Sequence, residues 1–236
     1  ITGEASVWYL YDYETTINNI RKLYGDRASE LKIILMLRNP VYRAWSHYLV
    51  KKARLRDPLT FEESIRPETI RERMDMGLTY SYDYIGFGHY AKQVKAWRDA
   101  FPKTRIWIHE EFFADIPRSI AEVAEHLEIP MDKSLMITRR VNPSGVYRNR
   151  SAGWLSAQLL ESSGWKTALK SILPPAVRYR LKMRTLQSML KRESMAASTK
   201  QQLQAYFLPH IRELETVLGR SLDIWLDPDT PQPLSE

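Results

Sequence analysis

The chain has 236 residues, of which 44% are apolar, and this is enough to bury one sizeable core. It contains no cysteine, which excludes disulfides, thiolate metal ligands and thiol catalysis and fits a reducing cytoplasm. No apolar run approaches the ~20 residues that a membrane span requires. The formal net charge of +7 is unevenly placed, because residues 139–192 carry +11 and the remainder −4. This asymmetry fits an anionic partner, and a solvated basic helix is the alternative.

The chain opens with an acid beside an aromatic cluster. Residues 3–11 read GEASVWYLY, so that Glu4 follows a glycine and precedes the aromatic side chains. Residues 15–24 then place apolar side chains at helical spacing and end at Gly25, a helix terminator. We therefore expect a scaffold helix directly after the segment that carries Glu4.

The most informative stretch is residues 31–48, LKIILMLRNPVYRAWSHY, because its pattern changes once and abruptly. Residues 32–37 are a short apolar run of the kind expected of a strand buried on both faces. Asn39 is a good N-cap and Pro40 suits the first helical position, so a helix is predicted from Pro40 onward. Arg38 then lies at the carboxyl end of the strand, where open α/β sheets place their ligand sites, and Ser46 lies two turns into the helix.

Downstream of this unit the pattern is mainly helical. Thr60 and Glu63 form a capping box that begins a helix, which Pro67 interrupts before Gly77. Residues 78–90 are rich in tyrosine. Aromatic side chains that pack on a helix are more often core than ligand platform, yet we expect one or two of these tyrosines to line a ligand cleft.

A second strand and a basic loop follow. Residues 105–109 predict another short buried strand, whose last residue, His109, has no second ligand nearby in the sequence and is interpreted as a strand-end residue. Asp115 predicts the cap of the next helix, and residues 138–151 are turn-rich and basic. The last part of the chain predicts a basic helix from Pro174 and then a long helix that opens with a Ser198–Gln201 capping box and ends at Gly219. We expect a kink or restart of the long helix at Pro209. Leu222 and Trp225 are then expected to pack back as an apolar anchor.

The central unit contains the pattern R-x-P-x-x-R-x-x-S, formed by Arg38, Pro40, Arg43 and Ser46. It resembles the 3′-phosphate-binding motif of sulfotransferases that use 3′-phosphoadenosine 5′-phosphosulfate (PAPS). The resemblance implies that Arg38 and Ser46 hold the 3′-phosphate of the nucleotide. The alternative is that Arg38 is a solvated strand-end residue and Ser46 an accidental helix serine.

Two further segments are similar to the same family. Residues 3–10 resemble its G-E-x-S-P-x-Y-L element, with Val7 in place of the proline, and this implies that Glu4 is the general base that takes the proton of the acceptor hydroxyl. The alternative is an exposed glutamate near a chain end. The loop at 138–151 resembles the late loop that closes over the 3′-phosphate, which makes Arg148 and Arg150 candidates to bind it.

The resemblance implies an α/β fold of the P-loop-like sulfotransferase type, with a short parallel sheet flanked by helices and a helical C-terminal part. We expect a single domain over residues 1–227 and a tail over 228–236. The family's first strand and its phosphosulfate loop, a K-x-G-T-T-like turn, match no segment here, and we expect them to precede Ile1.

The implied activity is transfer of a sulfuryl group from PAPS to a hydroxyl or amine of a carbohydrate or small-molecule acceptor in the cytoplasm. This chemistry requires no metal, and neither a metal-ligand cluster nor a nucleic-acid partner is expected. The alternative function is a non-catalytic basic module that binds nucleic acid or a polyanionic glycan through residues 139–192. The sequence determines neither the acceptor nor the oligomeric state.

Overall fold

The computed structural model describes residues 2–53, 56–78, 80–131, 146–147, 190–191 and 193–226. The chain divides into two compact units: residues 1–44, 83–139 and 197–236 form the first, and residues 45–82 and 140–196 form the second. Each unit is described by itself. The single domain expected over residues 1–227 stays a prediction.

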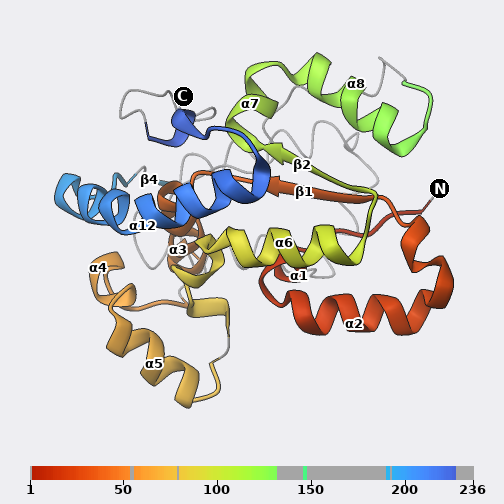
Figure 1. Cartoon of the computed structure of the whole chain (residues 1–236). Coiled ribbons are helices and arrows are strands. Elements are labelled where there is room, and N and C mark those ends of the chain that lie inside the picture. The colour runs from red at the N-terminus through yellow and green to blue at the C-terminus, as the bar shows by residue number, and fades with distance from the viewer. Residues whose placement is uncertain are drawn as a thin grey trace, which may run out of the picture. The chain divides into compact units, whose positions relative to one another are not determined.

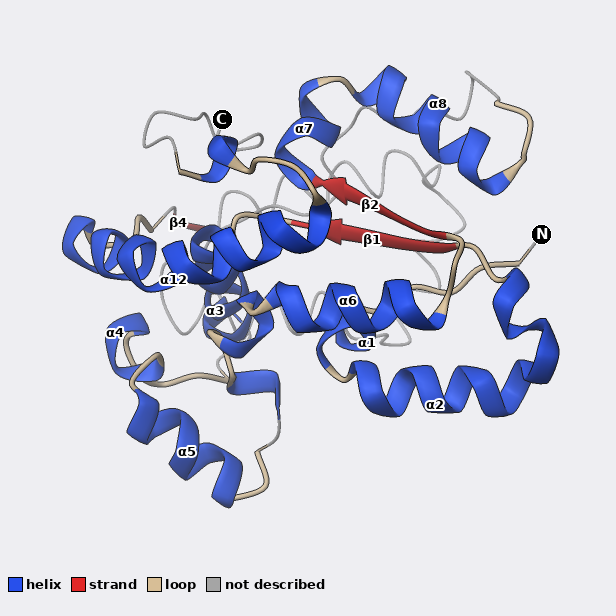
Figure 2. Cartoon of the chain, viewed as in Figure 1, coloured by secondary structure: helices blue, strands red, loops and turns tan. Residues whose placement is uncertain are grey.

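The first unit is built on two parallel strands, β1 (Ile33–Leu37) and β2 (Thr104–Ile108). Their register pairs Ile33 with Thr104 at one end and Leu37 with Ile108 at the other, so the two carboxyl ends lie at the same edge of the sheet (Figure 2). Helices dominate the rest of the described chain. The predicted α/β class with a short parallel sheet flanked by helices is confirmed.

Strand β1 differs from its prediction in one respect, because only one of its faces is buried. Leu35 and Leu37 are 6% and 0% exposed, whereas Ile34 and Met36 are 39% and 41% exposed. Successive side chains of a strand point to opposite faces, but a run of apolar residues carries no record of that alternation. The expectation that both faces are buried was therefore wrong.

The helices of the first unit pack mainly around α6 (Tyr90–Ala100), which contacts α1, α2 and α12. In Figure 1, α6 runs below the two strands and α8 above them. The other elements of this unit are α1 (Trp8–Tyr11), α2 (Tyr13–Tyr24), η1 (Gly25–Glu30), η3 (Gly86–Gly88), α7 (His109–Ala114), α8 (Ile116–Leu127), α12 (Ala197–Leu218) and η5 (Asp223–Trp225).

Local signals set most of these helix ends. Helix α2 ends at Gly25, whose φ of 55° is easily adopted by glycine, and the Asp115 side chain accepts a hydrogen bond from the Arg118 N–H at 3.1 Å at the start of α8. Helix α12 begins at Ala197, one residue before the predicted cap Ser198, and continues through Pro209.

None of the helices in the described ranges is both long and apolar enough to cross a membrane.

Helix α3 (Pro40–Ala53) begins in the first unit and continues into the second. The second unit also holds α4 (Phe61–Ser64), α5 (Pro67–Asp75), η2 (Tyr80–Tyr82) and the antiparallel pair β3 (Val146–Tyr147) and β4 (Leu190–Lys191). The capping box of Thr60 and Glu63 is present, and the helix is interrupted before Pro67. Both predictions are confirmed.

A buried ion pair organises the described part of the second unit. Asp57 and Arg73 are 4% and 7% exposed and form two hydrogen bonds, of 2.7 and 3.0 Å, between guanidinium and carboxylate. The carboxylate also accepts from the Ser64 hydroxyl and the Leu59 N–H, each at 3.1 Å. Because both charges are out of water, each depends on the other for compensation.

We therefore expect Arg73→Met to lower the free energy of unfolding by about 3–5 kcal/mol, since it leaves a buried carboxylate without its cation. Urea denaturation measures the effect. Arg71→Met is the matched control, because Arg71 is exposed on the same helix, and we expect little change there. Equal losses in the two variants would contradict the importance of the pair.

Candidate active site

The turn between β1 and α3 is fixed by Asn39. Its side-chain oxygen accepts a hydrogen bond from the Val41 N–H at 3.0 Å, which confirms the predicted N-cap. Its side-chain nitrogen donates to the main-chain carbonyl of Trp225 at 3.0 Å. The cap of α3 is therefore also the point at which the C-terminal turn η5 joins the sheet edge.

Glu110 completes this connection from the second strand. The side chain is 3% exposed and lies in the first turn of α7, directly after β2. One carboxylate oxygen accepts from the Asn39 N–H at 3.1 Å, and the other accepts from the indole N–H of Trp225 at 2.8 Å. A single buried carboxylate thus links the ends of both strands to η5.

Arg38 and His109 follow the last paired residues of β1 and β2, so they are neighbours at the carboxyl edge of the sheet. Burial, together with the charge of Arg38, lowers the pKa of His109 to about 4, which makes the imidazole neutral near pH 7. The carbonyl of Arg38 accepts a hydrogen bond from the Tyr90 hydroxyl at 3.0 Å, and burial raises the pKa of Tyr90 to about 12. This edge therefore holds a guanidinium beside neutral hydrogen-bonding groups.

Arg43 adds a second cation to this part of the first unit. Its guanidinium donates to the carbonyl of Tyr84 and lies over the Phe87 ring, 5.3 Å from the centroid. Burial is the main cause that lowers its pKa, and the charge of Arg38 lowers it further. Two guanidinium groups that destabilise each other favour an anionic ligand.

Glu4 lies before α1 in a segment that is neither helix nor strand, and it is exposed. Its carboxylate accepts a hydrogen bond from the Tyr9 hydroxyl, and this hydrogen bond is the main cause that raises the pKa of Tyr9. The Ser6 hydroxyl accepts from the Trp8 N–H at 3.3 Å. The Gly3–Glu4–x–Ser6 segment is therefore tied to α1 through its own side chains.

The structure describes fewer contacts, or none, for the remaining predicted site residues. Ser46 is half-buried in the part of α3 that belongs to the second unit. Arg148 and Arg150 lie outside the described residues. Tyr84 and Tyr90 of the tyrosine-rich segment are buried core residues. The roles predicted for Glu4, Arg38, Ser46, Arg148 and Arg150 stay predictions.

Comparison with known proteins decides the family. The sulfotransferase domain family matches residues 26–173. The chain belongs to the sulfotransferase domain family. The fold is also similar to the crystal structure of a sulfotransferase from Alicyclobacillus acidocaldarius, at 25% sequence identity and a TM-score of 0.63, over 95% of this chain and 67% of that chain. Among curated protein sequences none matches the chain.

Family membership confirms the resemblance seen in the sequence, and the structure adds a second connection between the start of α7 and the C-terminal residues. Glu110 and Glu111, directly after β2, contact the C-terminal residues 219–225 twice, since Trp225 donates to Glu110 and Arg220 forms a bidentate ion pair with Glu111. Within the described ranges, this sulfotransferase has no group of three or more His, Cys, Asp or Glu side chains that could hold a metal ion.

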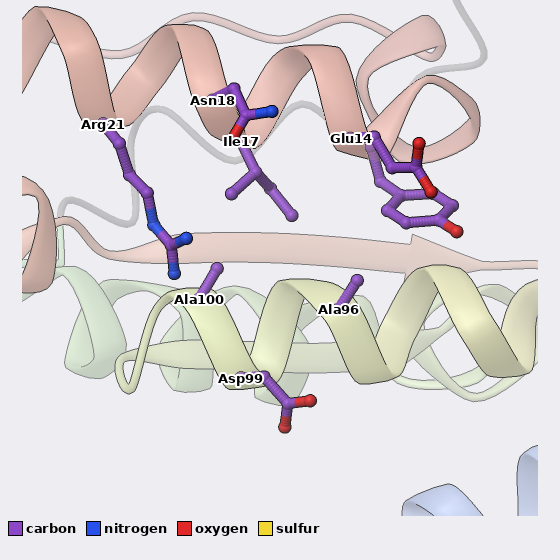
Figure 3. A pocket seen from close by; sticks show the side chains of 8 residues that line it. Glu14, Ile17, Asn18, Arg21, Ala96, Asp99 and Ala100 are labelled. Carbon is purple, nitrogen blue, oxygen red and sulfur yellow. The ribbon is translucent and has the colours of Figure 1, made fainter.

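A pocket in the first unit lies away from this edge. It has a volume of about 340 Å³ and lies between α2 and α6, with Ile17 and Arg21 on one side and Ala96 and Ala100 on the other (Figure 3). Helix α6 leads into the amino end of β2, whereas ligand sites in open α/β sheets lie at the carboxyl ends of the strands. Its position is therefore unlike that of a nucleotide site.

The sequence left two features of the site unassigned. His109 was interpreted only as a strand-end residue, yet the parallel register makes it the neighbour of Arg38. Arg43 was part of the motif without a role, and its contacts with residues 84 and 87 were not predicted. For His109 the sequence did hold a usable signal, because two predicted parallel strands each end in a basic or ionisable side chain, and such ends meet at one edge of the sheet.

The Glu110 network predicts the effect of Trp225→Phe. This variant removes the indole donor and leaves one oxygen of a buried carboxylate without a partner, so we expect the free energy of unfolding to fall by about 1–3 kcal/mol more than in Trp97→Phe. Trp97 is a matched control, because it is also buried and its indole N–H has no hydrogen-bond partner among the described residues. Chemical denaturation of both variants measures the difference, and equal losses would show that the Trp225–Glu110 bond contributes nothing.

Proposed function

We propose that this sulfotransferase moves a sulfuryl group from PAPS to a hydroxyl or amine of a carbohydrate or small-molecule acceptor. The observation that carries the proposal is the strand–turn–helix unit, in which Arg38 follows β1 at the carboxyl edge of the parallel sheet and α3 begins at Pro40. This is where an open α/β fold places a nucleotide.

In this proposal Arg38 and Ser46 bind the 3′-phosphate. The charge of Arg43 adds to the positive potential around Arg38. The N–H groups of Asn39 and Val41 are already bonded to Glu110 and to the Asn39 side chain. Side chains rather than these two amides would therefore hold the phosphate, and a guanidinium is suited to do so with two hydrogen bonds.

Two arginines of the basic loop share the same phosphate in the proposal. Arg148 and Arg150 follow residues 142–145, where the sequence predicts a turn, and this segment resembles the late loop that closes over the nucleotide in this family. They belong to the stretch 139–192, whose charge of +11 supports an anionic ligand in general.

Glu4 is the proposed general base. As the acceptor oxygen attacks sulfur, the bond between sulfur and the 5′-phosphate oxygen breaks, and 3′-phosphoadenosine 5′-phosphate (PAP) leaves with that electron pair. The acceptor proton goes to the Glu4 carboxylate. The exposure of Glu4 and its position on a segment held by Tyr9 are compatible with this role.

The nucleotide anchor is tested with calorimetry of PAP binding. A charge-assisted hydrogen bond contributes on the order of 1.5–3 kcal/mol, so Arg38→Ala should weaken PAP binding by about tenfold or more. Arg27→Ala, at an exposed arginine of η1, is the control and should bind PAP like the wild type. The wild type should bind PAP more tightly than adenosine 5′-phosphate, which lacks the 3′-phosphate.

The same titrations decide between the anchor and a diffuse basic surface. Arg148→Gln and Arg150→Gln should each lower PAP affinity more than Lys182→Gln. If all three variants lower PAP affinity equally, residues 139–192 act as a diffuse positive electrostatic field and not as a specific phosphate site. Salt-sensitive binding of any polyanion, with no preference for PAP, would support the basic-module function instead.

The base is tested with Glu4→Gln in the natural full-length protein. We expect unchanged PAP affinity and a turnover number lower by roughly a hundredfold to ten-thousandfold, because glutamine keeps the shape but cannot take a proton. PAP release from PAPS is measured with the hydroxyl-bearing sugar or phenol that the wild type turns over fastest. Glu14→Gln, an exposed acid on α2, is the control. Near-normal turnover of Glu4→Gln would assign proton transfer elsewhere, with His47 and His89 tested next.

A further inference from the structure

Phe87 is the centre of an aromatic cluster that joins separate parts of the first unit. Its ring stacks on Tyr11 with the centroids 4.1 Å apart and an angle of 16°, and Trp8 meets it edge-on at 5.3 Å. The guanidinium of Arg43 lies over the same ring at 5.3 Å. Helix α1 and the first turns of α3 therefore contact one buried side chain.

Asp83 makes the second connection to α1. One carboxylate oxygen accepts from the Tyr11 hydroxyl at 2.7 Å, and the other accepts from the Gly86 N–H at 2.6 Å. Gly86 has no side chain, and a Cβ atom there would collide with the Asp83 carboxylate. The turn at residues 83–86 is thus shaped to present Asp83 to Tyr11.

The segment 84–88 is in turn held against the start of α3. Arg43 donates to the carbonyl of Tyr84. Gly88 fits so closely that a Cβ atom would lie 2.9 Å from the Pro40 side chain and 2.7 Å from Phe207. A continuous set of contacts therefore runs from α1, through residues 83–88, to the turn that carries Arg38.

Helix α1 depends on these contacts for its position. It has four residues, none of them buried, and a helix of this length is not stable in water by itself. The Glu4 carboxylate is bonded to Tyr9 on this helix. Glu4 can keep a defined position only if α1 does, and the hydrogen bond from Tyr11 to Asp83 and the stacking of Tyr11 on Phe87 supply that constraint.

We propose that Tyr11, Asp83 and Phe87 are positioning residues that hold the Glu4 segment in a fixed relation to the start of α3. The inference rests on the proposed function, in which Glu4 is the base and Arg38 the nucleotide anchor. Catalysis is sensitive to misplacement of a catalytic group by about 1 Å, so a loosened α1 reduces turnover without weakening nucleotide binding.

The experiment uses Tyr11→Phe, which removes the hydroxyl bond to Asp83 and keeps the stacked ring. Tyr24→Phe is the matched control, because Tyr24 is an exposed tyrosine at the end of α2. Hydrogen exchange of the amides of residues 4–12 and PAP affinity are measured for both variants. Turnover is measured in the wild-type and Glu4→Gln backgrounds.

We expect Tyr11→Phe to raise amide exchange in residues 4–12 and to lower the turnover number by about tenfold, the loss expected for a hydrogen bond to a charged group. PAP affinity should stay within about twofold of the wild type. In the Glu4→Gln background the same change should have no further effect on turnover, because a positioning residue acts only through the group that it positions. Tyr24→Phe should change none of these quantities.

Unchanged exchange in residues 4–12 would overturn the inference, as would an equal loss of turnover in both backgrounds or a parallel loss of PAP affinity. Failure of the proposed function gives a different result. Near-normal turnover of Glu4→Gln would remove the base assignment, and with it the catalytic part of the inference. The exchange measurement, which needs no activity, would still decide whether Tyr11 and Asp83 hold the segment.

Discussion

The buried carboxylate of Glu110 is the interaction on which the sheet edge depends. An ionised carboxylate away from water is costly unless its oxygens are bonded, and here one oxygen takes the Asn39 N–H and the other the Trp225 indole. Asn39 returns to Trp225 through its side-chain nitrogen. These three residues close a cycle of hydrogen bonds, so none of them can move without exposing a polar group of another.

This cycle joins three parts of the chain at the carboxyl edge of the sheet. Glu110 after β2, Asn39 before α3 and Trp225 near the C-terminus lie far apart in the chain but form one support for the turn between β1 and α3. Arg38 lies in that turn beside His109, and its carbonyl is held by Tyr90. The proposed nucleotide anchor therefore projects from backbone that is fixed on several sides.

A second support, the aromatic cluster around Phe87, lies next to the segment that carries the proposed base, Glu4. It connects the short helix next to Glu4 with the segment that Arg43 holds against α3. The two supports differ in kind. The Glu110 cycle is buried and polar, and it stabilises the fold, whereas the Phe87 cluster constrains an exposed segment that has little stability of its own.

The sequence by itself determined the features that depend on neighbouring residues. The strand–turn–helix unit, the Asn39 cap, the end of α2 at Gly25 and the Thr60–Glu63 capping box were predicted because each is encoded within a few residues. The family motif around Arg38 was visible for the same reason. The roles of the predicted site residues stay predictions, since motif spacing shows resemblance and no ligand contact.

Tertiary structure decided what joins these local features. The bonds from Asn39 to Trp225 and from Tyr11 to Asp83 span 186 and 72 residues, and no local pattern specifies such pairs. The same holds for His109 beside Arg38, which follows only from strand register, and for the exposed face of β1, which an unbroken apolar run conceals. Sequence periodicity reports which residues share a face of one element, whereas burial and polar partners depend on which other element covers that face.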